Sequence, residues 1–89
     1  MKAVVTVIGK DSKGIIAAVS GECAKLGGNI VDISQSVMRE YFAMIMLADI
    51  DALTIPFADF VDMLAAYGDE RGLIVSAMHE DIFNTMHHI

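Results

Sequence analysis

The segment best suited to hold a small ligand runs from Gly9 to Ile15, between an apolar run and a helical pattern. Where a chain leaves a strand and enters a helix, unpaired backbone N–H groups and the helix dipole favour an anion. Lys10 and Lys13, two of the six basic residues in the chain, lie in this segment. The alternative is a plain capped turn with two solvated lysines, and the segment alone slightly favours it.

Gly14 is predicted to lie in the first turn of that helix. Glycine there costs about 1 kcal/mol relative to alanine, and close approach of a ligand or of another backbone is one reason to accept the cost. Asp11 or Ser12 is predicted to cap the helix by accepting hydrogen bonds from its free N–H groups.

Asn29 and Asp32, which follow Gly27 and Gly28, are the second candidate group. An asparagine amide both donates and accepts, and an aspartate is an anionic acceptor. Loop N–H groups for a carboxylate, with these oxygens for an ammonium, would bind a free amino acid. Within one subunit the two groups should lie at opposite ends of the first helix, so only a partner paired through its edge strand could bring them together. The alternative, a strand-start Asn that satisfies its own turn beside an exposed Asp, is favoured by these residues alone.

Two other groups of residues could form a metal site or supply a nucleophile, and for both a purely structural role is the better explanation. A metal site is suggested by His79, His87, His88, Glu80 and Asp81. No second histidine lies at a helical ligand spacing from His79 or His87, which favours solvated histidines. Cys23 falls on an apolar helical stripe, where a buried, inert thiol is expected. We therefore expect no metal ligand, no catalytic residue and no cofactor.

The charge balance excludes several classes of partner. Twelve acidic and six basic residues give a net charge of −6. A nucleic-acid-binding protein needs a basic stripe to neutralise phosphates, so nucleic acid is excluded and an anionic membrane surface is disfavoured. The apolar stretch from Ala3 to Ile8 is too short for a signal sequence or a membrane span. One cysteine permits no internal disulfide. The expectation is a cytoplasmic protein.

The chain is too apolar for its size to be a comfortable monomer. With glycine counted and tyrosine left out, about 61% of its 89 residues are apolar, against about 45–50% in typical soluble domains. Some of that surface is expected in a subunit interface, and a homodimer is the simplest form.

Alternation and helical periodicity predict strand–helix–strand–strand–helix–strand. The ranges are strands 2–8, 29–38, 41–49 and 73–78, helices 13–26 and 55–67, and a tail, 79–89, with apolar residues at short-helix spacing. Gly68 is predicted to end the second helix. Right-handed crossovers then give an α+β, ferredoxin-like βαββαβ sandwich: a four-stranded antiparallel sheet with both helices on one face. The first and third strands are apolar on both sides and should be central. We expect the dimer to pair second strands into one continuous sheet, with face-to-face packing as the alternative.

The runs VTVIGKDSKGIIAAVS and LGGNIVDISQ, with EYF and the HEDIF of the tail, resemble an ACT domain. The resemblance covers nearly the whole chain, residues 1–89, as a single domain. It is closest to small stand-alone ACT-domain proteins related to the glycine-cleavage-system regulator. It implies the same sandwich, association in pairs or larger sets, and amino-acid binding at the interface. The ligand contacts it implies are Asp11, Gly14, Ile15, Asn29 and Ile30.

The expected function is a non-catalytic regulatory module that binds a small ligand, an amino acid, at a homodimer interface. The candidate ligand-binding residues are Asp11, Ser12, Lys13, Gly14, Ile15, Asn29, Ile30 and Asp32. One alternative is an interaction module for an unidentified regulatory protein, based on its apolar sheet face and its Met-rich third strand. Another is a hydrolase of the acylphosphatase kind. That reading is disfavoured because such enzymes use an arginine in the first loop, whereas Arg39 and Arg71 lie outside it in sequence.

Overall fold

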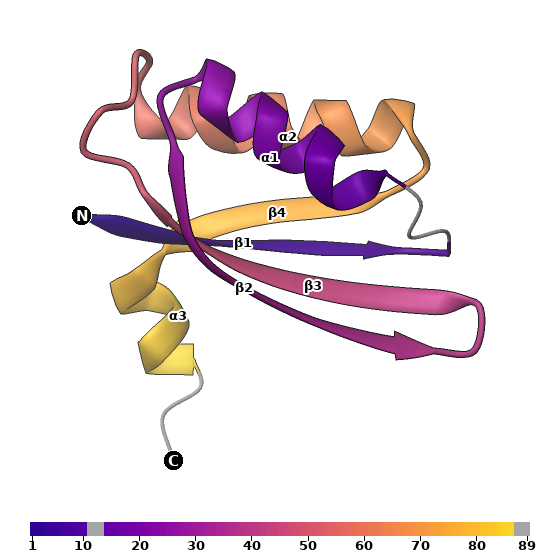
Figure 1. Ribbon diagram of the computed structural model, residues 1–89. Coiled ribbons are helices and arrows are strands. Elements are labelled where there is room, and N and C mark those ends of the chain that lie inside the picture. Colours follow the sequence, from indigo (N-terminus) through magenta and orange to yellow (C-terminus); the bar gives the residue numbers. More distant parts are fainter. Residues whose placement is uncertain (11–13, 87–89) are drawn as a thin grey trace.

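The computed structural model describes residues 1–10 and 14–86. Figure 1 shows a sheet with α1 and α2 on one face and α3 on the other. Its elements, in chain order, are β1 (Lys2–Gly9), α1 (Ile15–Lys25), β2 (Asn29–Met38), β3 (Tyr41–Asp49), α2 (Phe57–Glu70), β4 (Ile74–His79) and α3 (Glu80–Met86). The predicted fold class and element order are confirmed. None of the described helices is long and apolar enough to cross a membrane.

The four strands lie in the order β2-β3-β1-β4, and every neighbouring pair is antiparallel. The prediction that β1 and β3 are central is therefore confirmed. Because β1 is antiparallel to both of its neighbours, Gly9 lies opposite Phe42 of β3 and Ile8 lies opposite Ile74 of β4. The segment after β1 and the turns before β3 and β4 consequently share one end of the sheet.

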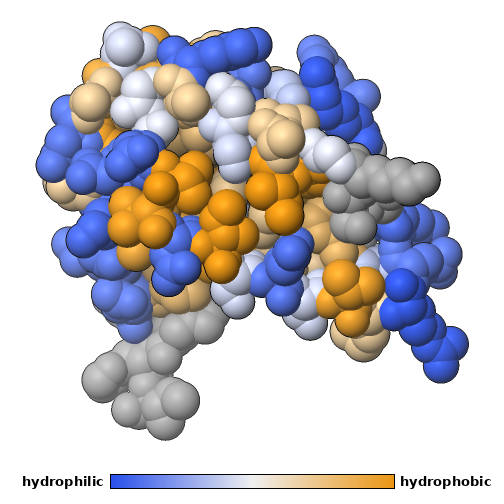
Figure 2. All heavy atoms as spheres, viewed as in Figure 1, coloured by the Kyte–Doolittle hydropathy of each residue, from blue (hydrophilic) through white to orange (hydrophobic). Residues whose placement is uncertain are grey.

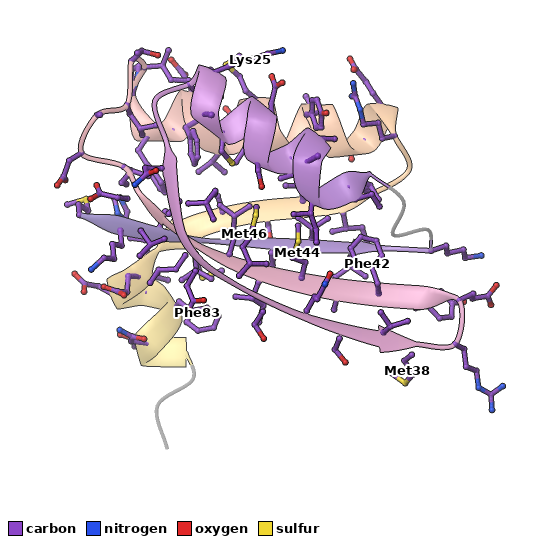
Figure 3. The ribbon with its side chains drawn as sticks, in the orientation of Figure 1. Lys25, Met38, Phe42, Met44, Met46 and Phe83 are labelled. Atoms are coloured by element: carbon purple, nitrogen blue, oxygen red, sulfur yellow. The ribbon has the colours of Figure 1, made fainter. Side chains whose placement is uncertain are left out.

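The core lies between the sheet and the two helices α1 and α2. Figure 3 shows Phe42, Met44 and Met46 extending from β3 towards these helices. The two methionines are fully buried, as are Phe60 and Leu64 of α2. Methionine side chains are unbranched and adapt to irregular gaps, so they suit the interface between a twisted sheet and two helices.

A bulge interrupts β2 near its start. Ile30 pairs with Ala48 and Asp32 pairs with Leu47, so Val31 is the extra residue. A bulge changes which residues share a face. Ile30 consequently packs against the core on the helix side, whereas Asn29 and Asp32 fall on the opposite face. Beyond the bulge the predicted alternation holds, with Ile33 on the helix side and Ser34 on the other.

The prediction that Gly68 ends the second helix is wrong, because α2 continues through it to Glu70. Gly68 is buried, and a Cβ added there would lie 2.5 Å from a methyl group of Val75 in β4. The glycine serves close packing of the helix on the strand. His79 was assigned to the tail, but it is the last residue of β4, and its ring centroid lies 4.0 Å from that of Phe57.

Gly21 and Gly68, two glycines inside helices, should respond oppositely to substitution by alanine. Nothing lies within 4 Å of a Cβ added at Gly21, so Gly21→Ala should raise the free energy of unfolding by about 1 kcal/mol through helix propensity. Gly68→Ala must displace β4 and should lower it by about 1–3 kcal/mol. Chemical denaturation measures both, and a stabilising Gly68→Ala would contradict the packing explanation.

Candidate ligand-binding site

A hollow of about 410 Å³ opens at the end of the sheet where β1 ends. Its walls come from the β1–α1 junction and from the α2–β4 turn. Its described lining residues are Lys10, Gly14, Ile15, Ala18, Arg71, Gly72 and Leu73. The volume lies in the range of small-molecule sites, about 300–1,000 Å³.

Gly14 forms the entrance to α1 and borders this hollow. It has φ 70° and ψ 0° at the N-cap position, and its carbonyl accepts a hydrogen bond of 2.9 Å from the N–H of Ala18. The prediction that Gly14 lies within the first turn is wrong, because it precedes the helix. Its left-handed conformation, which side chains disfavour, explains the glycine. The predicted contacts Asp11, Ser12 and Lys13 lie outside the described residues.

Arg71 is a lining residue that the sequence analysis missed. Its guanidinium carbon lies 3.6 Å from the ring centroid of Tyr67, and its Nη1 donates to the Tyr67 carbonyl at 3.1 Å. The same nitrogen lies 3.4 Å from a carboxylate oxygen of Glu70. The order of strands could have revealed Arg71, because the turn before β4 must lie beside the end of β1.

The described charges on this hollow are all positive. Lys10 and Arg71 are its only charged lining residues among those that the structure describes, although the chain carries a net charge of −6. The Lys10 ammonium lies 5.7 Å from the ring centroid of Tyr41, which is not a lining residue of this hollow. The described lining therefore carries two cations although the chain as a whole is acidic.

The second group of predicted ligand residues lies at the other end of the sheet. Asn29 is exposed and pairs with Asp49, which in turn lies opposite Lys2 at the start of β1. The Asp32 carboxylate accepts a hydrogen bond of 2.9 Å from the Ile33 N–H. One chain therefore does not bring the two groups together, as the sequence analysis anticipated.

Cys23 is completely buried on α1, as predicted. Burial raises the pKa of its thiol from an ordinary value near 9 to about 11, because the thiolate would lose its hydration. The thiol is therefore neutral at physiological pH. Within residues 1–10 and 14–86, no three His, Cys, Asp or Glu side chains gather in a way that could hold a metal ion.

Comparison with known proteins decides the family. Residues 2–77 match the family model of the ACT domain. The chain belongs to the ACT-domain family. A UPF0237 protein of Listeria monocytogenes is 46% identical over 87 residues, which cover 98% of each chain. The ACT domain protein from Streptococcus pneumoniae superposes with a TM-score of 0.81 at 41% identity, over 93% of each chain.

A more distant ACT-domain likeness concerns the fold alone. A structure named as a candidate glycine cleavage system transcriptional repressor is 24% identical, with a TM-score of 0.70. The match covers 86% of this chain and 44% of that one. The match of residues 2–77 to the ACT-domain family model confirms the ACT-domain resemblance drawn from the sequence motifs.

The environment of Cys23 predicts slow reaction of the native protein with a thiol reagent. At pH 8 the raised pKa leaves about 100-fold less thiolate than an unperturbed thiol, and burial also blocks access. Reaction with a chromogenic disulfide should therefore be at least about 100-fold slower than in denaturant at the same pH. Equal rates would contradict this.

The same shift predicts how stability depends on pH. Because folding raises the pKa of the Cys23 thiol, the neutral thiol makes its full contribution to the free energy of unfolding below pH 9. That contribution is lost as the pH rises through about 11. Cys23→Ala should therefore lose less stability than the native protein between pH 9 and 11. Denaturant titrations between pH 8 and 11 measure the free energy of unfolding of both.

Proposed function

We propose that this ACT domain is a non-catalytic regulatory module that binds a small carboxylate-bearing metabolite, an amino acid, at the entrance to α1. The observation that carries the proposal is the hollow beside Gly14, whose described charges are Lys10 and Arg71. A guanidinium binds a carboxylate through paired N–H donors. Arg71 is held by Tyr67 at the mouth of the hollow, so part of the entropy cost of orienting it is already met.

The unpaired edge of β2 supports a homodimer. Among the described strands β2 pairs only with β3, and its outer edge carries exposed apolar side chains at Val31, Ile33 and Val37. Figure 2 shows apolar surface gathered on the side of the molecule where β2 and α1 lie. A long apolar edge strand pairs readily with another strand, and a second β2 is matched to it.

Antiparallel pairing of two β2 strands would complete the site. The end of β2 lies beside the row formed by Val37, Phe42 and Gly9, which is the end of the sheet that carries the hollow. Reversing the second strand moves the start of its β2 to this end. Asn29 of the second copy, with Ile30 turned to the helix side by the bulge, would then approach the α1 entrance and could accept a hydrogen bond from the ligand's ammonium.

The lining of the hollow favours binding over bond-breaking. Among its described residues there is no carboxylate, imidazole or thiol that could act as nucleophile or general base. The position of Arg71 supplies an arginine near the first loop, which an acylphosphatase-like hydrolase would need. However, Glu70, whose carboxylate lies 3.4 Å from that guanidinium, is not among the described lining residues, and none of those lining residues carries a carboxylate, imidazole or thiol to activate water.

A panel of the twenty amino acids, followed by thermal unfolding, tests the proposal. A ligand at 100 times its Kd stabilises the folded state by about 2.7 kcal/mol, and each kcal/mol raises the Tm of a domain this size by about 4–8 °C. Arg71→Ala should reduce the shift by at least about half, because it removes the carboxylate partner. Asn84→Ala, on α3 and away from the hollow, should retain it. A flat panel at millimolar concentrations would reject the proposal.

Mixing two variants tests whether the site is shared between copies. Arg71→Ala and Asn29→Ala should each weaken binding by at least about tenfold, since each removes a hydrogen-bonding partner of a charged ligand group. In a mixed dimer one of the two sites regains both residues. Calorimetry of the mixture should therefore recover tight binding at reduced stoichiometry, whereas a site formed within one chain would show no recovery.

The dimer itself is tested by placing charge on the β2 edge. Val37→Lys should shift the assembly towards lower mass, because it places a charge in the apolar edge that the second β2 would cover. Met63→Lys is the matched control, since Met63 is an exposed apolar residue on α2. Sedimentation equilibrium measures both, and an unchanged mass for Val37→Lys would contradict pairing through β2.

A further inference from the structure

The sheet face opposite α1 and α2, here called the open face, is covered at one end only. Figure 1 shows α3 standing against one end of this face, where it contacts β1 and β4. Phe83 extends from α3 towards the strands (Figure 3). At this end Val4 of β1 pairs with Met78 of β4, and Val4 is only 4% exposed although neither α1 nor α2 lies on this side.

The other end of the open face repeats the same apolar surface without a cover. Ile8 of β1 pairs with Ile74 of β4, and these side chains are 47% and 67% exposed. Between the covered and uncovered pairs, the hydroxyls of Thr6 and Ser76 bond to each other at 2.6 Å. The neighbouring strands β1 and β4 therefore carry two apolar cross-strand pairs of similar kind, of which one is covered by a helix.

We propose that the uncovered pair, Ile8 and Ile74, binds the α3 helix of a second copy. The two copies would be related by a two-fold axis that lies between their open faces and runs across the strands. This axis reverses the ends of the sheet, so each α3 lies over the Ile8–Ile74 pair of the other copy. Ile82, on α3, is 51% exposed and supplies the apolar contact. The interface is separate from the β2 edge and goes beyond the proposed function.

The spacing along the strands admits two helices side by side. Val4 and Ile8 are four residues apart, which is about 13 Å at 3.3 Å per residue. Two packed helices need about 8–10 Å between their axes. A second α3 over Ile8 and Ile74 would therefore lie next to the first, and the two helices would form one layer between two sheets.

The charges at the two ends of the open face favour a second copy as the occupant. α3 begins with Glu80 and Asp81, which line a hollow together with Lys2 at the covered end, whereas Lys10 lies at the opposite end, over the Tyr41 ring. The two-fold axis brings the acidic start of each α3 towards the Lys10 end of the other copy. Between these ends the open-face residues Thr6 and Ile8 on β1 and Ile74 and Ser76 on β4 are uncharged. Two acidic chains can therefore meet here without opposing like charges.

Cross-linking tests the contact directly. Ile74→Cys and Ile82→Cys are mixed under mild oxidation by air with copper phenanthroline, which oxidises two thiols to one disulfide. The mixture should give at least about tenfold more disulfide-linked pairs than a mixture of Ile74→Cys with Met63→Cys, the matched control on α2. Equal yields in the two mixtures would overturn the proposal.

Sedimentation equilibrium separates this interface from the β2 edge. Ile74→Glu should halve the mass of the assembly relative to Met63→Glu, because it buries a charge under the second α3. Ile74 is exposed, so circular dichroism should show an unchanged fold. If the β2 edge is unpaired, Val37→Lys leaves the mass unchanged while Ile74→Glu still halves it. An equal mass for Ile74→Glu and Met63→Glu overturns the α3 contact and leaves the proposed ligand site untouched.

Discussion

The antiparallel pairing of β1 with both β3 and β4 is the constraint on which the rest of the structure depends. Because β1 is central, its Val5 and Val7 are fully buried beneath the helices. Because both neighbours run against it, its end meets the starts of β3 and β4. The α1 entrance and the α2–β4 turn must therefore meet at one place, and the hollow with Lys10 and Arg71 follows from this meeting.

A second consequence follows from the size of the chain. In 89 residues, of which 55% are hydrophobic, one layer of two helices covers one face of the sheet. The third helix is only 7 residues long and covers part of the other face. Small domains bury a modest fraction of their surface, so the remaining apolar area at the β2 edge and around Ile74 lies on the outside. The association between copies that we propose would remove this apolar area from water.

The surroundings of Cys23 and Arg71 set the chemistry of each side chain. The Cys23 thiol is kept neutral by burial, and the Arg71 guanidinium is oriented by an aromatic ring and a backbone carbonyl. Neither arrangement activates a nucleophile. The oriented guanidinium is the feature that supports the proposed binding of a carboxylate ligand.

The sequence by itself determined the elements of this ACT domain and their order, because alternation and helical periodicity are local. Strands 29–38 and 41–49 were predicted to the residue, and the apolar character of both faces placed β1 and β3 at the centre. The separation of Asn29 from the α1 entrance also followed from this topology.

Only the tertiary structure decided the features that depend on contacts between distant segments. Gly68 has the propensity of a helix terminator, but its contact with Val75 keeps it inside α2. The bulge at Val31 follows from the register in which β2 pairs with β3. Arg71 lines the hollow because β4, which follows it, lies beside β1. Packing and strand register depend on residues far apart in the chain, so a local sequence pattern does not predict them.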